Sequence, residues 1–195
     1  MERDQLHWDK RFAARANEPG EPESFLLQQC NRLNKGSVLD LASGDGRHSL
    51  FLASIGFSVT AADISPIALS RLNHFSSLKD SPIRTVQMDF DDNLSLLGPD
   101  AFEDMFDNLI IFFFKPPDHL WKVIPDLLKP GGKIILCSFN LQQHDKKGFS
   151  SRFCLKPGEL TSVHPQLEVE LYQTFEDKGR FLDAYVFRKM NVAES

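Results

Sequence analysis

The segment best suited to chemistry is a short glycine-rich turn, Asp40-Leu41-Ala42-Ser43-Gly44-Asp45-Gly46-Arg47. Its small residues at positions 42, 44 and 46 let a ligand approach the backbone without meeting bulky side chains. The turn follows a short apolar run and precedes apolar residues at helical spacing, so it should deliver a ligand to a helix N-terminus. The free N–H groups of such a terminus favour an anion. The segment therefore predicts a ligand-binding turn.

A second carboxylate lies at a suitable separation from this turn. Asp63 ends the apolar run 57–62 and is 19 residues after Gly44. In open α/β sheets, an acid at about this separation, at the end of the second strand, accepts hydrogen bonds from two ribose hydroxyls. The turn and Asp63 together predict a nucleoside-containing ligand, although a helix-capping role for Asp63 is an alternative.

The elements that must position these residues alternate between strands and helices. Ser65-Pro66 is a strong helix start, because serine suits the N-cap and proline the first helical position. Strands linked by helices imply parallel order with right-handed crossovers. The sequence therefore predicts a doubly wound, Rossmann-like α/β fold. Apolar runs place its five parallel strands at 38–42, 57–62, 83–88, 106–114 and 133–139.

The C-terminal part has a different pattern. Residues 167–172 alternate apolar and polar side chains, Asp177-Lys178-Gly179 is turn-like, and 181–187 is rich in aromatic residues. This pattern predicts an antiparallel hairpin at one edge of a mostly parallel sheet. Residues 140–165 show no clear period and are expected to form a substrate loop with a short helix from Pro157 to Val163.

Length and composition favour one domain. The chain has 195 residues, within the roughly 100–200 of a typical domain. The parts expected within residues 1–195 are a helical cap (1–35), a cofactor-binding core (36–139), the loop (140–165) and the hairpin (166–190).

Charge and composition also restrict the partners and the compartment. The net charge of −5 argues against a nucleic-acid-binding face. Three widely spaced cysteines form neither a disulfide framework nor a metal pattern, so no metal is expected. The N-terminus shows no secretory signal, and no apolar stretch reaches the roughly 18 residues of a membrane helix. We therefore expect a cytoplasmic protein that binds a small molecule rather than nucleic acid or membrane.

The spacing of the glycines helps to identify the cofactor. A dinucleotide fingerprint needs a third glycine three residues after the second, where Ser49 or Arg47 stands, depending on the register. The pattern acid-x-small-x-Gly-x-Gly instead resembles the first motif of class I S-adenosylmethionine-dependent methyltransferases. Within that class, the chain is most similar to the tellurite-resistance and thiopurine-methyltransferase-like branch. Five segments within residues 6–139 carry this resemblance: Trp8-Asp9-Lys10-Arg11-Phe12, Pro22-Glu23-Ser24-Phe25-Leu26, the residues 38–49, the residues 59–69 and Leu127-Leu128-Lys129-Pro130-Gly131-Gly132.

The resemblance implies a site for S-adenosyl-L-methionine. Asp40 and the turn would surround the methionine portion, Asp63 would bind the ribose, and Ile64 would pack on the adenine. Asp89 would accept from the adenine amino group, unless it belongs to a solvated acidic turn with Asp91 and Asp92. Asn108 or the residues after it would close the methionine side. The implied cofactor-binding residues are Asp40, Ala42, Ser43, Gly44, Gly46, Asp63, Ile64, Asp89, Phe90 and Asn108.

Two departures from the family pattern affect the site. Ala42 replaces the usual first glycine, which is tolerable if its φ stays negative. Lys115-Pro116-Pro117 stands where the branch often has a His-Leu-Pro-like segment. The substrate is therefore the property that the resemblance predicts least well.

Methyl transfer from a sulfonium depends mainly on alignment and exclusion of water. A soft nucleophile, such as a thiol or a metalloid oxyanion, would need no protein base once ionised. An anionic acceptor would need cations, although each candidate arginine has a structural explanation as well. We assign no catalytic residue. The candidate substrate contacts are Trp8, Arg11, Arg47, Phe113 and Arg152.

The sequence leaves three other functions to consider. A nucleic-acid methyltransferase acting on amino groups would have an Asn/Asp-Pro-Pro-aromatic tetrad, and Lys115-Pro116-Pro117-Asp118 is not one. A nicotinamide-dependent oxidoreductase is disfavoured by the missing glycine. A non-catalytic protein that binds S-adenosylmethionine stays open, as does the oligomeric state.

Overall fold

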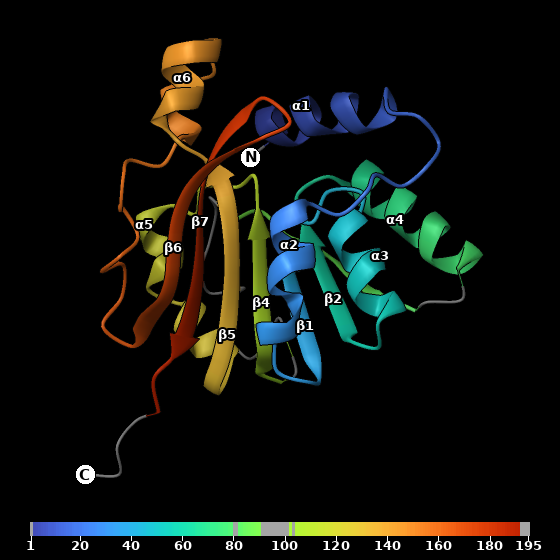
Figure 1. The fold of residues 1–195 in the computed structure, drawn as a ribbon. Coiled ribbons are helices and arrows are strands. Elements are labelled where there is room, and N and C mark those ends of the chain that lie inside the picture. The colour runs from blue at the N-terminus through green and yellow to red at the C-terminus, as the bar shows by residue number, and fades with distance from the viewer. Residues whose placement is uncertain (1, 80–81, 91–101, 103, 192–195) are drawn as a thin grey trace.

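The fold is a single mixed sheet with helices on both faces, seen in a computed structural model that describes residues 2–79, 82–90, 102 and 104–191. Within these residues, the strands lie in the order β3-β2-β1-β4-β5-β7-β6 (Figure 1). Their bounds are β1 (Ser37–Leu41), β2 (Ser58–Asp63), β3 (Arg84–Gln87), β4 (Phe106–Phe112), β5 (Leu128–Phe139), β6 (Leu167–Asp177) and β7 (Arg180–Lys189).

The pairing of the strands confirms the predicted fold class. Strands β1 to β5 pair in parallel, and β7 pairs antiparallel with both β5 and β6. The hairpin turns at Lys178 and Gly179, whose φ angles are 51° and 73°. Two successive positive φ angles are typical of the tight turn that matches the twist of a hairpin. The sheet is therefore doubly wound, with the expected C-terminal hairpin at its edge.

Within the described residues, two of the α-helices begin at a side-chain cap. The α-helices are α1 (Glu2–Ala13), α2 (Ser24–Gln29), α3 (Arg47–Ser54), α4 (Pro66–Leu78), α5 (Asp118–Trp121) and α6 (Leu141–Lys147). The hydroxyl of Ser65 accepts a 3.1 Å hydrogen bond from the N–H of Ala68, so it caps α4 as predicted. No helix in the described part of the chain is long and apolar enough to cross a membrane.

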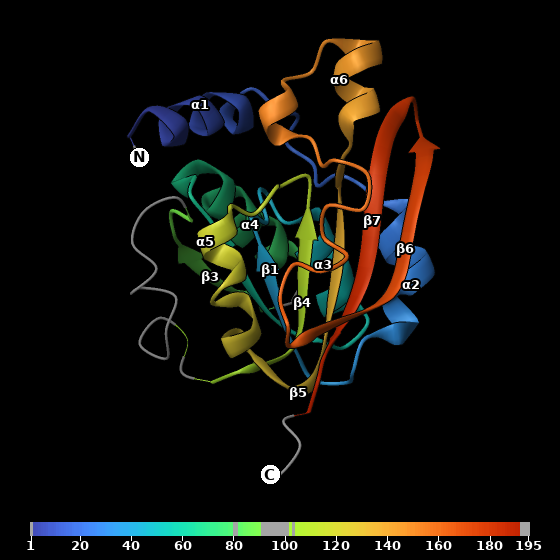
Figure 2. The same cartoon turned by 90° about the vertical axis from the view of Figure 1, so that its left-hand side faces the viewer.

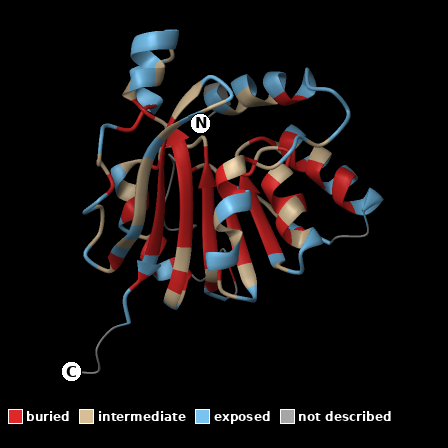
Figure 3. Ribbon diagram, viewed as in Figure 1, coloured by how far each residue is buried: buried red, intermediate tan, exposed pale blue. Residues whose placement is uncertain are grey.

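The core has two halves, one on each face of the sheet. One half joins Leu120 and Trp121 of α5 to β4 and β5, and the other joins Phe25 of α2 and Leu52 of α3 to the opposite face of the same strands. The central strands are accordingly buried along most of their length (Figure 3). A sheet covered on both faces is rigid enough to hold residues at its edge in fixed positions.

The short helix expected from Pro157 to Val163 is wrong. Gly158 has a φ of 66°, a left-handed conformation that interrupts a right-handed helix, and the segment forms turns. The helix of this loop is α6 instead. It begins after Asn140, whose side chain accepts from the N–H of Gln142, and ends at Gly148, which has a φ of 68°. Its exposed, mostly polar residues have no apolar period that could reveal it.

Three segments lie beyond the carboxyl ends of the parallel strands. Helix α1, helix α6 and the turn between β6 and β7 are above these ends in two views at right angles (Figures 1 and 2). Ligands of open α/β sheets bind at this edge. The candidate site therefore lies between the strand ends and these segments.

Candidate functional site

The glycine-rich turn connects β1 to α3. Positions 42, 44 and 46 all have positive φ angles, 59°, 57° and 83°. The turn is held in place by the N–H of Ser43, which donates to the carbonyl of Ala62 on the neighbouring strand at 3.1 Å. A Cβ placed on Gly46 would lie 2.1 Å from Leu72 of α4, so this position requires glycine for close packing. The backbone of the turn thus lies next to the ends of β1 and β2.

Ala42 does not meet the condition of a negative φ under which an alanine is tolerable there. Its φ of 59° places an alanine in the left-handed region, which costs roughly 1–2 kcal/mol for a residue with a Cβ. The N–H of the next residue, Ser43, is hydrogen-bonded to the carbonyl of Ala62, so the backbone beside Ala42 is anchored to β2. Strained backbone persists where the surrounding structure determines it, and such residues cluster at binding sites.

Asp63 lies against the turn. One of its carboxylate oxygens, Oδ2, accepts from the N–H of Gly44 at 2.7 Å, and the other, Oδ1, accepts from the N–H of Ser65 at 2.9 Å. Burial is the main cause of a raised pKa for this carboxyl. A carboxylate has about four lone-pair sites, so two remain for hydroxyl donors. Capping and ribose binding are therefore compatible at Asp63.

Asp40 is the second buried acid beside the turn. It is 1% exposed, and burial raises its pKa to about 7 although the hydroxyl of Ser49 donates to Oδ2 at 2.6 Å. Its other oxygen, Oδ1, is buried and has no hydrogen-bond partner among the described residues. An unpaired carboxylate oxygen fits an ammonium donor, and the methionine end of S-adenosylmethionine carries one. The turn and its two acids therefore fit this cofactor.

The residues expected near the adenine lie at the adjoining ends of β2 and β3. The N–H of Met88 donates to the carbonyl of Asp63 at 2.9 Å, which brings Asp89 and Phe90 beside Ile64. Ile64 and Asp89 are half-buried, and the ring of Phe90 is buried against Phe114. Asp91 and Asp92, the other members of the acidic run, lie outside the described residues.

The structure does not bring Asn108 to this site. Its register partner is Val38 at the amino end of β1, so it lies at the opposite edge of the sheet. Its amide accepts from the N–H of Asn34 at 2.8 Å and donates to the carbonyls of Asn34 and Ser37. Through these bonds, the side-chain amide links β4 to the segment that precedes β1. The expectation that Asn108 closes the methionine side is therefore wrong, because it is near the start of its strand rather than the end.

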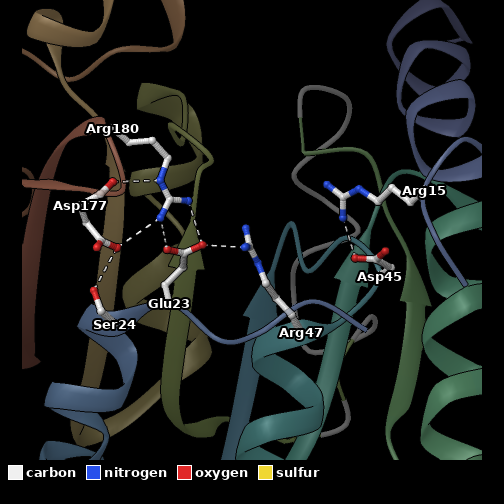
Figure 4. A network of polar contacts seen from close by, with 7 residues as sticks. All are labelled: Arg15, Glu23, Ser24, Asp45, Arg47, Asp177 and Arg180. Carbon is white, nitrogen blue, oxygen red and sulfur yellow. Dashed lines mark hydrogen bonds and ion pairs between the residues drawn. The ribbon is translucent and has the colours of Figure 1, made fainter. Parts of the chain in front are cut away.

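Helix α1 covers the turn through contacts that the sequence did not predict. A Cβ on Gly44 would lie 2.8 Å from Cζ of Phe12, so the phenylalanine ring rests on the glycine. Arg15, just after the helix, pairs with Asp45 of the turn at 2.7 Å (Figure 4). The hydroxyl of Ser65 donates to the carboxylate of Asp9. Contacts between segments that lie this far apart in the chain leave no pattern in a single sequence.

A second unpredicted feature is a buried acid between two arginines. Glu23, whose side chain is 5% exposed, pairs with Arg47 at 2.6 Å and with Arg180 of β7 at 2.6 Å (Figure 4). Arg180 also pairs with Asp177, which accepts from the hydroxyl of Ser24. The network joins the N-terminal segment, the start of α3 and the C-terminal hairpin.

The candidate substrate contacts are divided among three places. Arg47 and Phe113 share one cluster, since the guanidinium lies 5.1 Å from the centroid of the ring. Trp8 and Arg11 are on α1, with the guanidinium 4.9 Å from the indole ring. Arg152 is exposed, near Phe153, in the segment after α6. The described residues contain no group of three acidic, histidine or cysteine side chains placed to hold a metal.

Comparisons with known proteins identify the family. A family profile described as a methyltransferase domain matches residues 38–132. The glycine/sarcosine N-methyltransferase of Halorhodospira halochloris is 32% identical, over 95% of this chain and 70% of the relative. That of Parasynechococcus marenigrum is 36% identical over 85 residues, which are 43% of this chain and only 29% of the relative.

Solved structures agree on the fold. TehB from Haemophilus influenzae has a TM-score of 0.71 at 18% identity, with 93% of this chain and 67% of that one covered. The glycopeptide N-methyltransferase MtfA, solved with S-adenosylmethionine, has a TM-score of 0.64 at 18% identity, with 88% and 95% covered. With the glycine-rich turn and its acids in place, these similarities show that the chain belongs to the class I S-adenosylmethionine-dependent methyltransferases.

Proposed function

We propose that this chain transfers the methyl group of S-adenosylmethionine to a small-molecule acceptor. The observation that carries the proposal is the contact between Gly44 and Asp63, whose 2.7 Å hydrogen bond places a carboxylate with spare acceptor sites directly against the glycine-rich turn. When bound, the cofactor supplies a sulfonium whose methyl carbon is electrophilic.

Each side of the site has a proposed task. Asp63 accepts hydrogen bonds from the ribose hydroxyls, while Ile64, Asp89 and Phe90 bind the adenine. Asp40 and the turn residues Ala42, Ser43, Gly44 and Gly46 hold the methionine portion, with the free oxygen of Asp40 accepting from its ammonium group. The chain then needs only to align the acceptor with the methyl group and exclude water.

For the acceptor, we propose a soft nucleophile such as a thiol or a metalloid oxyanion. Its support is the resemblance of residues 6–139 to the tellurite-resistance and thiopurine-methyltransferase-like branch, together with the fold shared with TehB. An amino-acid acceptor is the second candidate. It is favoured by the 32% identity to a glycine/sarcosine N-methyltransferase, which extends over 95% of this chain.

The partners and compartment remain predictions from composition. The net charge of −5 disfavours a nucleic-acid substrate.

Titration calorimetry tests the cofactor site. We expect micromolar binding of S-adenosylmethionine and of its demethylated product, S-adenosylhomocysteine, and no comparable binding of NAD. The Asp63→Asn variant should weaken both by roughly 10- to 100-fold, because it replaces a charged acceptor of two hydroxyls. Asp126→Asn, at an exposed aspartate of the segment 124–127, is the matched control and should bind as the unaltered protein does.

Methyl transfer is measured by mass spectrometry of the acceptor. The panel comprises a small thiol, selenite, tellurite, glycine and sarcosine. Methylation of the sulfur or metalloid compounds supports the first acceptor class, and methylation of the amino acids supports the second. Tight cofactor binding with no turnover of any compound would favour a non-catalytic binding protein, and preferential NAD binding would contradict the proposed function.

A further inference from the structure

Four phenylalanine rings form a continuous row beyond the ends of β4 and β5. Phe113 follows β4 and Phe139 ends β5, with ring centroids 5.0 Å apart. Phe149, just after α6, lies 4.6 Å from Phe139, and Phe153 lies 6.2 Å from Phe149. We call these four residues the phenylalanine row. Because β4 lies next to β1 in the sheet, the row begins beside the glycine-rich turn and continues away from it.

The row is not an ordinary part of the core. Phe113, Phe139 and Phe149 are half-buried, and Phe153 is 43% exposed. Helix α6 and the segment after it, which carry the outer two rings, lie beyond the strand ends rather than on a face of the sheet (Figures 1 and 2). Partly exposed rings arranged in sequence offer flat apolar surfaces, on which another ring gains stacking energy beyond simple burial.

The backbone at the inner end of the row is strained. Phe113 has a φ of 54°, which is rare for a residue with a large side chain. As a result, Phe113 packs against the same half of the core as its neighbour Phe112, although successive residues of a regular strand alternate between faces. The strain places one more aromatic ring beside the turn, where a strand of regular conformation would turn it away.

Cations lie at this inner end. The guanidinium groups of Arg47 and Arg180 each lie 5.1 Å from the centroid of Phe113, and Glu23 holds both. The guanidinium nitrogens of Arg180 donate hydrogen bonds to Glu23 and Asp177. Arg47 differs, because within the described residues only its Nη1 has a hydrogen-bond partner, and its side chain keeps 28% exposure. Arg47 therefore has donors available for a further anion.

Resting on the function proposed above, we infer that the acceptor is a flat, apolar molecule that carries an anionic group. Its ring system stacks on Phe139 and Phe149, and its anionic group accepts hydrogen bonds from the free nitrogens of Arg47. This places the nucleophilic atom near Phe113, at the end of the row that adjoins the turn. Among the acceptors proposed above, such a body suits an aromatic thiol or an aromatic amine, and not a metalloid oxyanion, glycine or sarcosine.

Binding of three matched probes tests the inference. The protein is first saturated with S-adenosylhomocysteine, and each probe is then titrated calorimetrically. The probes are 2-naphthoate, which is flat and anionic, 2-naphthylmethylammonium, which is flat and cationic, and decahydronaphthalene-2-carboxylate, which is anionic but not flat. We expect 2-naphthoate to bind at least about tenfold more tightly than either of the others.

Variants separate the two parts of the subsite. Phe149→Leu keeps an apolar side chain but removes the ring, so it should weaken 2-naphthoate about fivefold and leave the saturated carboxylate unchanged. Arg47→Gln should abolish the preference for the carboxylate over the ammonium. Arg188→Gln, on the exposed part of β7, is the matched control and should change nothing. Because Arg47→Gln also removes an ion pair with Glu23, its thermal unfolding is measured beside Phe149→Leu, which keeps that pair intact.

The outcomes distinguish this inference from the proposed function. Equal binding of the three probes, or no probe binding to protein that still binds S-adenosylhomocysteine, would overturn the inference alone. Loss of the anion preference in Arg152→Gln but not in Arg47→Gln would overturn the assignment to Arg47. Failure to bind S-adenosylhomocysteine would remove the proposed function and this inference with it.

Discussion

The hydroxyl of Ser49 donates a 2.6 Å hydrogen bond to one oxygen of Asp40, and the second oxygen of the same carboxylate is buried without a partner among the described residues. Burial of this half-satisfied carboxyl is what raises its pKa to about 7, with a smaller contribution from the charge of Asp63. The acid beside the turn therefore changes its charge near neutral pH.

The first prediction concerns stability. Between about pH 4 and 7, the unfolded chain has lost the Asp40 proton while the native protein still holds it. The free energy of unfolding should therefore fall as pH rises through this range, by at most about 1.4 kcal/mol per pH unit from this group. Asp40→Asn lacks this contribution, so its free energy of unfolding should rise relative to that of the unaltered protein between pH 5 and 8. Urea denaturation measures this difference. Parallel pH profiles for the two proteins would contradict the prediction.

The second prediction concerns cofactor affinity. If ionised Asp40 pairs with the ammonium of the methionine portion, the ionised fraction sets the apparent affinity. With a pKa of about 7, that fraction rises roughly tenfold between pH 6 and 8, and the affinity for S-adenosylhomocysteine should rise with it. Asp40→Asn should bind more weakly with no such rise. Calorimetry at both pH values measures the affinity of the two proteins. If the affinity of the variant also rises with pH, another group is responsible.

The third prediction follows from the left-handed conformation of Ala42. Ala42→Gly should increase the free energy of unfolding by about 0.5–1 kcal/mol, because relief of strain exceeds the greater entropy of glycine in the unfolded chain. Ala53→Gly, inside α3, is the matched control and should lower the stability by up to about 1 kcal/mol. Thermal or urea unfolding measures both, and a loss of stability at both positions would mean that the φ of Ala42 is negative after all.

The fourth prediction separates Asn108 from the site. Asn108→Ala should destabilise the protein by about 2–3 kcal/mol, since it leaves the N–H and carbonyl of Asn34 without their partner. Its affinity for S-adenosylhomocysteine should equal that of the unaltered protein, measured well below the unfolding temperature. Weaker cofactor binding in a folded variant would restore Asn108 to the cofactor site.

The fifth prediction concerns Glu23. Glu23→Gln should lower the unfolding free energy by about 2 kcal/mol, because two partly buried arginines lose their shared carboxylate. Glu168→Gln is the matched control, since its partner Arg188 is 48% exposed, and its effect should be much smaller than that of Glu23→Gln. Equal effects of the two substitutions, measured by urea unfolding, would show that burial of Glu23 contributes nothing.

Much of the fold could be predicted because its signals are local. The apolar runs of the central strands, the Ser65-Pro66 helix start and the turn at Lys178-Gly179 each specify their own conformation. The glycine-rich turn and Asp63 were found by the same means, and the structure joins them by the bond from Gly44.

The failures have physical causes as well. Helix α6 was missed because it has no apolar face, and Gly158 interrupts the helix expected in its place. The expectation for Asn108 conflicts with the predicted strand 106–114 itself, because Asn108 is near the amino end of that strand and ligands bind at the carboxyl end. Glu23 and Arg180 are far apart in the sequence, so their pairing is not recognisable until the sheet brings them together.

The bond between Arg180 and Glu23 joins residues that are 157 positions apart. Contacts of such high sequence separation slow folding, because a long loop must close before they form. During synthesis, the glycine-rich turn and its two acids are complete long before β7 exists. Until the hairpin docks against β5, Glu23 lacks one of its two arginines and Phe113 lacks one of its two guanidinium neighbours. The acceptor side of the site should therefore be among the last regions to acquire native structure, and a chain truncated before residue 167 would contain the motifs of a methyltransferase without the means to finish the site.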